Sequence, residues 1–148
     1  MSHNMIVCGT CGAANRIPPA RSPKFAKCGK CGAKIFAGPP PDLNAANFDI
    51  QIKRNTIPVL VDVWAPWCGP CLMMAPAFEE AARKLEPQVR AIKLNSEAEQ
   101  DAAARLGIRS IPTMILFHQG REVARTSGAM SASQIVHWVC GHLPSVAV

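Results

Sequence analysis

Three Cys-x-x-Cys pairs carry most of the reactive chemistry of this 148-residue chain. Two pairs, at positions 8/11 and 28/31, lie in a basic leader, and glycine follows each of them. The third pair, at positions 68/71, comes shortly after a run of β-branched and apolar residues. Two close pairs roughly 20 residues apart can hold one metal ion, whereas a single pair between a strand and a helix suits thiol–disulfide exchange. The sequence therefore predicts two different sulfur sites.

The pair at positions 68/71 has the surroundings of a redox-active dithiol. Pro58–Trp64 is typical of a buried strand, and apolar residues at helical spacing after Cys68 predict a helix that reaches Leu85. Free amides and the dipole of a helix N-terminus stabilise a thiolate. Cys68 would therefore attack a disulfide, and Cys71, one turn into the helix, would resolve the mixed disulfide. Inert core cysteines or metal ligands are the alternative, but the neighbouring tryptophan, glycine and proline fit a redox turn better.

The leader pairs fit a four-thiolate metal site. Cys8, Cys11, Cys28 and Cys31 have the spacing C-x2-C-x16-C-x2-C, which is typical of a structural zinc site. The glycine after each cysteine would let the backbone turn tightly enough for amides to point at sulfur. Iron suits four thiolates too, and further redox dithiols or plain disulfides are the remaining alternatives. These pairs, however, lack the preceding strand, the tryptophan and the following helix.

The leader has little else with which to build a core. Its larger apolar residues are Ile6, Val7, Ile17, Phe25, Ile35 and Phe36. Metal binding would therefore supply most of its folding free energy. We hypothesise that strong oxidants could convert the thiolates to disulfides, release the metal and unfold this part of the chain.

The positive charge of the chain is concentrated in the same leader. Residues 1–41 hold six lysines and arginines and no acidic residue, so the formal charge of +6 lies there. A four-thiolate cage with one divalent ion carries two net negative charges, which this basic character would partly offset. A nucleic-acid-binding ribbon is a further alternative, but only Phe25 and Phe36 could stack on bases. We therefore expect no nucleic-acid partner.

Length and composition predict one ordinary domain with a small appendage. No apolar run approaches the roughly 18 residues that span a bilayer, and the N-terminus lacks the apolar stretch of a signal peptide. Seven cysteines, an odd number, fit a reducing compartment better than a fully oxidised scaffold. We expect a cytoplasmic protein without a membrane partner.

The chain divides into three predicted parts. Residues 1–36 form the four-cysteine module, the Pro/Gly-rich residues 37–44 form a linker, and residues 45–148 form the main domain. The order β-α-β-α-β-β-α in the main domain indicates an α/β protein with a central mixed sheet and helices on both faces. The predicted elements are helix 47–54, strand 58–64, helix 68–85, strand 89–94, a helix that Ser96-x-x-Glu99 opens and Gly107 closes, a hairpin of 113–117 and 122–126, and a last helix opened by Ser131-x-x-Gln134.

Two segments of the main domain resemble those of a known family. Val61–Cys71, which reads VDVWAPWCGPC, is similar to the active-site segment of thioredoxins, and Gly107–Thr113, GIRSIPT, resembles their second active-site loop. The similarity covers residues 45–143. With its four-cysteine leader, the whole chain resembles the zinc-containing thioredoxin-2 type of bacterial thioredoxins. This resemblance implies a thioredoxin fold with a small N-terminal zinc-ribbon-like module and one structural Zn²⁺ ion.

The resemblance assigns roles to two polar residues. Asp62 matches a buried aspartate that accepts or relays a proton for Cys71, and burial in an apolar strand would raise its pKa towards neutrality. Lys93 matches a lysine that lies near this aspartate and stabilises its charge. Without the resemblance, Asp62 could be a polar residue of an edge strand facing water. Lys93 could likewise be a solvent-facing strand residue.

The resemblance also implies a substrate-binding surface beside the dithiol. Pro112 matches the family's cis-proline, and a cis Ile111–Pro112 bond would expose backbone groups on which a substrate peptide could pair as an extra strand. Leu72 and Ser110 depart from the family, which commonly has a basic residue at the first position and often a glycine at the second. These departures bear on substrate preference and leave the reaction class unchanged. The other residues implied in this surface are Trp67, Gly69, Pro70 and Gly128.

The function that follows from the resemblance is that of a cytoplasmic, monomeric protein-disulfide reductase acting on disulfide-containing proteins. An NADPH-dependent thioredoxin reductase would regenerate the dithiol, with no flavin or nicotinamide bound to this chain. The Gly-Pro between Cys68 and Cys71, with no histidine, favours a reductant over an oxidase or isomerase. The alternative is a zinc-dependent binding or holdase protein whose thioredoxin domain serves mainly as a docking platform.

Overall fold

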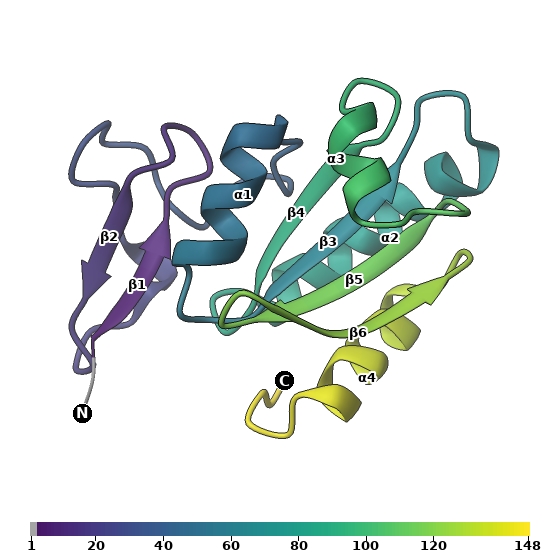
Figure 1. Ribbon diagram of the computed structural model, residues 1–148. Coiled ribbons are helices and arrows are strands. Elements are labelled where there is room, and N and C mark those ends of the chain that lie inside the picture. Colours follow the sequence, from purple (N-terminus) through teal and green to yellow (C-terminus); the bar gives the residue numbers. More distant parts are fainter. Residues whose placement is uncertain (1–2) are drawn as a thin grey trace.

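The computed structural model describes residues 3–148, which form two separate sheets and their helices (Figure 1). Residues 1–2, at the start of the predicted module 1–36, lie outside the described residues. Across residues 3–148, no helix has the length and apolar character needed to cross a bilayer. In chain order the elements are β1 (Asn4–Val7), β2 (Ala14–Ile17), the 3-10 helix η1 (Pro23–Phe25), α1 (Ala45–Arg54), β3 (Val59–Trp64), α2 (Gly69–Leu85), β4 (Arg90–Asn95), α3 (Gln100–Arg105), β5 (Thr113–His118), β6 (Arg121–Ser127) and α4 (Ala132–His142).

The main sheet has four strands in the order β4-β3-β5-β6. β3 runs parallel to β4 and antiparallel to β5, and β5 forms the predicted hairpin with β6, so the sheet is mixed as expected. The two residues of the hairpin turn, Gln119 and Gly120, have φ angles of 54° and 78°, as a two-residue type I′ turn requires. β3 has a neighbouring strand on each side, and its residues Val59–Val63 are all buried. The strand that leads into the dithiol is thus an interior, buried strand of the sheet.

Helices cover both faces of this sheet, as predicted. α2 and α4 pack on one face against a core that includes Leu60 and Met114. α1 and α3 pack on the other face against a core that includes Val61 and Ile115. Figure 1 shows α3 in front of the sheet and α2 behind it. Successive residues of β3 therefore contribute to different cores, because side chains alternate across a strand.

Local sequence signals explain the start of one helix but not of another. At α4, Ser131 and Gln134 form the predicted capping box. At α3 the predicted box is wrong, because the Ser96 hydroxyl donates to the carbonyl oxygen of Trp64 and α3 begins only after Glu99. The Glu99 carboxylate instead accepts from the first amide of α1. Both side chains of the expected box thus have tertiary partners that replace the local cap.

The N-terminal module is a two-stranded antiparallel sheet followed by a second cysteine loop. Gly12 and Gly32, which follow the two cysteine pairs, both take a φ of 77°, a conformation that side chains other than glycine rarely adopt. Phe25, expected among the few apolar residues of the module's core, is instead 80 % exposed. The small core of the module consists of cysteines and of the isoleucines Ile6, Ile17 and Ile35. Ile57 of the main domain packs into the same core, which therefore joins the two parts of the chain.

Backbone hydrogen bonds attach the module and the linker to the main domain. The outer edge of β1 faces the C-terminal end of α1 (Figure 1), where the Thr56 amide donates to the Met5 carbonyl oxygen at 2.9 Å. Further along the chain, the Lys93 amide donates to the Pro41 carbonyl oxygen at 2.8 Å, and the Leu43 amide donates back to the Lys93 carbonyl oxygen at 3.0 Å. The end of the linker thus runs along the outer edge of β4.

Candidate dithiol and metal sites

The cysteine pair at positions 68/71 lies where β3 has ended and α2 begins. Cys68 is the N-cap residue of α2, and its sulfur accepts from the Cys71 amide at 3.2 Å. The two cysteines form a disulfide, with their Cα atoms 5.2 Å apart. Pro70 has no amide hydrogen, so the Cys71 amide is the first-turn donor directed at the Cys68 sulfur. When the disulfide is reduced, this helix start can stabilise a thiolate at Cys68.

Exposed apolar groups and backbone atoms surround the dithiol. The Ile111–Pro112 bond is cis, and the Cys68 sulfur lies 3.8 Å from the Ile111 carbonyl oxygen. Gly128, with a φ of 100°, donates its amide to the Pro112 carbonyl oxygen at 2.9 Å. Trp67 is 69 % exposed beside a hollow of about 600 Å³ that Ile111 also lines. The predicted surface residues between the two cysteines, Gly69 and Pro70, are exposed as well.

Asp62 is fully buried in β3, so the alternative of a water-facing edge position is wrong. Within the part of the chain that the structure describes, neither of its carboxylate oxygens has a hydrogen-bond partner. Burial raises the pKa of Asp62 to about 7, against the opposing effect of the positive charge of Lys93. Because Asp62 shares a sheet face with Leu60, it lies under α2, the helix that carries the dithiol. A carboxyl group that titrates near neutrality is suited to proton transfer.

Lys93 lies beside Asp62 on the neighbouring strand. The two residues are register partners of β4 and β3, so their side chains leave the same face of the sheet. The Lys93 Nζ atom lies 4.5 Å from the centroid of the Trp64 ring, and the residue is half-buried. It is therefore not the fully solvent-facing strand residue of the alternative interpretation. Its ammonium group faces an aromatic ring and a buried carboxyl.

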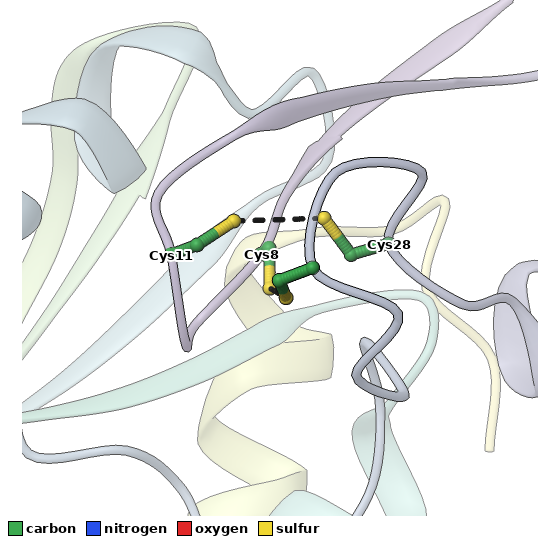
Figure 2. Close-up of side chains that lie close together, drawn as sticks. Cys8, Cys11 and Cys28 are labelled. Atoms are coloured by element: carbon green, nitrogen blue, oxygen red, sulfur yellow. Dashed lines mark hydrogen bonds between the residues drawn. The ribbon is translucent and has the colours of Figure 1, made fainter.

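The four leader cysteines form a second site, which we call the cysteine cage. Their sulfur atoms all lie within 4.8 Å of one another, with 3.7 Å between Cys8 and Cys31 and 3.6 Å between Cys11 and Cys28. Figure 2 shows the Cys11 and Cys28 side chains turned towards each other from the two cysteine loops, with Cys8 close to both. Four sulfurs at about 2.3 Å from a tetrahedral zinc ion would be about 3.8 Å apart, whereas a disulfide needs about 2.05 Å. The donor set therefore fits one tetrahedral metal ion.

Amide donors point at the sulfurs of the cage. The amides two residues after Cys8 and Cys28 each donate to that cysteine's sulfur at 3.4 Å. Asn15, which the motifs do not single out, donates its side-chain amide to the Cys28 sulfur at 3.5 Å. The pKa of Cys28 is lowered to about 6, first by the backbone amide of Cys31 and then by Asn15. Such donors favour the thiolate form in which cysteine binds metal.

Arg90, also not singled out by any motif, joins the module to the main domain. Its side chain is 3 % exposed, its Nη1 atom donates to the Ile35 carbonyl oxygen at 2.8 Å, and the same atom lies 3.7 Å from a Glu86 carboxylate oxygen. The Phe36 ring centroid is 5.3 Å from its guanidinium carbon. A Cβ atom at Gly9 would collide with the guanidinium group. Arg90 therefore contacts the module beside both cysteine loops.

Two buried amide side chains hold β1 against α1. Asn55 Oδ1 accepts from the Val7 amide at 2.8 Å, and Gln51 Nε2 donates to the Val7 carbonyl oxygen at 3.3 Å. The Asn55 side-chain amide also donates to the Gln51 carbonyl oxygen at 2.9 Å. Both side chains are buried. Because Val7 directly precedes Cys8, these amides position one end of the cysteine cage relative to the main domain.

Comparison with known proteins covers both parts of the chain. Residues 40–140 match the thioredoxin family, and residues 7–33 match the family described as thioredoxin 2, N-terminal. The chain is 41 % identical to thioredoxin C-3 of Corynebacterium nephridii over 91 % of its own length and 92 % of that protein. It is 39 % identical to a thioredoxin of Haemophilus influenzae over 68 % of its length and 94 % of that protein.

Proposed function

Because this chain belongs to the thioredoxin family of oxidoreductases, we propose that it is a cytoplasmic protein-disulfide reductase that acts by dithiol–disulfide exchange. One observation supports this reaction most directly: Cys68 and Cys71 are disulfide-bonded at the N-terminus of α2, with an amide directed at the Cys68 sulfur. The bonded pair corresponds to the oxidised product of the reaction. An NADPH-dependent thioredoxin reductase would return it to the dithiol, so this chain needs no flavin or nicotinamide of its own.

The reaction consists of two exchanges of sulfur bonds. In the reduced protein, the Cys68 thiolate attacks one sulfur of a substrate disulfide, which forms a mixed disulfide and expels the other substrate sulfur as a thiolate. Cys71 then loses its proton, and its thiolate attacks the Cys68 sulfur. This step forms the 68–71 disulfide and releases the second substrate thiolate. Two electrons pass to the substrate, and the dithiol of the enzyme is oxidised.

Asp62 is our candidate for the group that accepts the Cys71 proton. The carboxyl group lies under α2, has no hydrogen-bond partner among residues 3–148, and has a pKa raised to about 7 by burial. It can therefore take up and return a proton near neutral pH. Lys93 would stabilise the ionised form through its charge, since it is the register partner of Asp62 on β4. The proton would then pass to a departing substrate thiolate or to water.

We propose that the substrate lies on the surface formed by Trp67, Gly69, Pro70, Ile111, Pro112 and Gly128. Exposed apolar area beside the dithiol supports this assignment, because Trp67 and the neighbouring Leu72 and Met73 remain largely exposed. A substrate in extended conformation could pair with the backbone of the 111–112 segment, which passes next to the Cys68 sulfur. Leu72 makes this rim apolar where the family commonly has a basic residue. We therefore expect a preference for apolar residues near the substrate disulfide.

We further propose that the cysteine cage binds one structural Zn²⁺ ion. When bound, the ion would cross-link the two cysteine loops of the module. Iron suits the same four sulfurs, and metal analysis separates the two. The family matches at 7–33 and 40–140 also support a division into a module at 1–36, a linker at 37–44 and a thioredoxin domain at 45–148. The proposed ligands are Cys8, Cys11, Cys28 and Cys31.

Substitution of Cys68 tests the proposed function. In an assay that couples NADPH oxidation through thioredoxin reductase to the reduction of insulin disulfides, Cys68→Ser should lower the rate to the background, because serine cannot form the mixed disulfide. Cys140→Ser is the matched control, since Cys140 is a half-buried free thiol of α4. This control should keep the wild-type rate.

The alternative of a zinc-dependent binding or holdase protein predicts a different result. If Cys68→Ser retained full function in cells while loss of the metal abolished it, the thioredoxin domain would be a docking platform and the reductase proposal would be wrong. Under the reductase proposal, substitutions of the cage cysteines should keep most of the insulin reduction. The two proposals thus differ in whether the dithiol or the cysteine cage is required for function.

A further inference from the structure

The module has a hollow on the side of β2, with a volume of about 690 Å³. Figure 1 places β2 on the side of β1 away from α1, so this side of the module does not pack against α1. The hollow is separate from the dithiol surface and shares no lining residue with it. Its lining comes from β2, η1 and the segments that follow each of them, and it includes Asn15, Arg16, Arg21, Phe25, Lys27 and Gly29.

The hollow is positively charged, and the surrounding sequence contains no acidic residue. Arg16, Arg21 and Lys27 line it and are exposed. Among residues 3–148, none of these three side chains forms an ion pair. Residues 1–41 contain no acidic residue that could neutralise them. The hollow therefore offers three cations to a ligand from outside the chain.

An exposed aromatic ring lies at the same place. Phe25 is 80 % exposed, although it belongs to an ordered turn and not to a loose end of the chain. The Ser22 hydroxyl oxygen caps this turn by accepting from the Lys24 amide at 3.3 Å, and the Ala26 amide donates to the Pro23 carbonyl oxygen at 3.0 Å. The turn thus keeps a large apolar side chain in water beside the cations. Exposed aromatic residues of this kind are enriched where proteins bind one another.

The floor of the hollow is tied to the cysteine cage. Asn15 Oδ1 accepts from the Gly29 amide at 2.9 Å, while its Nδ2 atom donates to the Cys28 sulfur. The same side chain thus joins β2 to the second cysteine loop. This link holds β2, which carries Arg16, beside the cysteine loop that follows Lys27.

We propose that this hollow is a docking site for an acidic segment of a partner protein. Carboxylates of the partner would pair with Arg16, Arg21 and Lys27, since a guanidinium group and a carboxylate form paired, charge-assisted hydrogen bonds. An apolar or aromatic side chain between these carboxylates would pack on Phe25. The site is independent of the dithiol reaction, so it can hold a partner whether or not that partner carries a disulfide.

The aromatic content of the module favours a polypeptide over a nucleic acid. Proteins that bind single strands without sequence preference stack successive bases on several rings. Only Phe25 is available in this hollow, because Phe36, the other aromatic residue of the module, is half-buried with its ring facing the Arg90 guanidinium. One ring with three cations fits an acidic peptide that has a single apolar anchor.

The proposal can be tested with the full-length, zinc-loaded protein and a fluorescein-labelled peptide of about twelve residues, all glutamate except one central phenylalanine. Fluorescence anisotropy at about 0.15 M salt, where exposed long-range charge effects are screened, should show saturable binding. Arg16→Gln/Arg21→Gln should weaken the Kd by about tenfold or more, and Phe25→Ser should weaken it by about threefold or more. The matched control Lys53→Gln/Arg54→Gln removes the same charge from the exposed end of α1 and should change the Kd by less than about twofold.

Amide chemical shifts of ¹⁵N-labelled protein should locate the peptide at β2, η1 and the segment around Gly29. Equal weakening by both double variants, or shifts confined to the Trp67–Ile111 surface, would mean that the hollow is not a docking site. Tighter binding of a labelled thymidine oligonucleotide, lost in Arg16→Gln/Arg21→Gln, would overturn the peptide proposal in favour of a nucleic acid. All variants should reduce insulin at the wild-type rate, so failure of this proposal is distinct from failure of the reductase function.

Discussion

At the scale of single residues, Asp62 is the most unusual group in the chain. It is a fully buried carboxyl group on an interior strand, without a hydrogen-bond partner among residues 3–148. Its pKa is raised from 3.8 to about 7, mainly by burial. The native protein therefore keeps a proton between about pH 4 and pH 7 that the unfolded chain has lost. The contribution of Asp62 to the free energy of unfolding therefore falls as the pH rises through this window.

Asp62→Asn should remove this pH dependence. The substitution should raise the free energy of unfolding at about pH 8 by about 4 kcal/mol more than at about pH 4, since the cost of burying this carboxyl group grows as the pH rises from its unfolded pKa to its native pKa. Chemical unfolding of both proteins across this range would measure the difference. Burial also raises the pKa of Glu86 to about 7. Because both proteins contain Glu86, its contribution to the pH dependence is the same in each and cancels in the difference. Parallel stability curves for the two proteins would show that Asp62 does not titrate in this window.

Cys71→Ser should separate the two exchange steps. Cys68 would still attack, but without Cys71 the mixed disulfide could not be resolved within the protein. We expect a covalent complex with a disulfide-containing substrate that survives non-reducing electrophoresis and disappears on reduction. The Cys68→Ser/Cys71→Ser protein is the control and should form no complex. A stable complex of the double variant would place the nucleophile elsewhere.

At this scale the sequence predicted the site residues whose type and spacing are typical of only a few kinds of site. The Trp-Cys-Gly-Pro-Cys segment and the spacing of the leader cysteines predicted groups that the structure brings together at Cys68/Cys71 and in the cysteine cage. Asn15 and Arg90 could not be found in this way, because their partners lie in other loops and strands. For Arg90 one signal existed: a charged residue within the apolar run Val89–Leu94 needs a partner. For Asn15 there was none.

At the scale of elements, buried polar side chains join the module to the main domain. Gln51 of α1 and Asn55, the residue that caps its C-terminal end, bind both backbone groups of Val7. In an isolated helix these two residues would be interpreted as water-facing. Only the packing of β1 on α1 makes them buried, so the helix was predictable from sequence while its docking face was not. The failed capping box at Ser96 has the same origin, since a tertiary partner replaced the local one.

Arg90→Met should loosen this attachment. The change leaves the Ile35 carbonyl oxygen and the Glu86 carboxyl group without their buried partner, at a cost of about 3 kcal/mol. Hydrogen exchange should report faster exchange at the Val7 amide and the amides of the cysteine loops, while the amides of β3 and β5 keep their protection. Arg83→Met, an exposed arginine of α2, is the matched control and should leave exchange unchanged. Unchanged exchange at Val7 in Arg90→Met would contradict the proposed attachment.

At the scale of the whole molecule, the dithiol site and the cysteine cage depend on different hydrophobic cores. The sheet and helices that position the dithiol pack around two cores that contain no residue from positions 1–36. The module has a core of a few isoleucines and the cysteines themselves. Its order should therefore depend on the metal, whereas the order of the dithiol site should not.

Removal of the metal with a strong chelator should unfold the module and spare the reaction. We expect loss of hydrogen-exchange protection at Gly12 and Gly32, whose amides donate across the cysteine loops, and recovery after addition of Zn²⁺. The rate of insulin reduction should change by less than about twofold, because the dithiol site keeps its own cores. Loss of activity in step with loss of the metal would show that the module holds the dithiol site in place.

The contact between the linker and β4 has a consequence for the protein's solubility. A strand at the end of a sheet exposes unpaired backbone groups that can recruit a strand from another chain. The backbone bonds of Pro41 and Leu43 to Lys93 occupy part of that edge on β4, while charged side chains such as Arg121 and Glu122 mark the opposite edge on β6. A shortened linker that cannot reach β4 would uncover its edge. The segment that joins the two parts thus also protects the sheet against edge-to-edge aggregation.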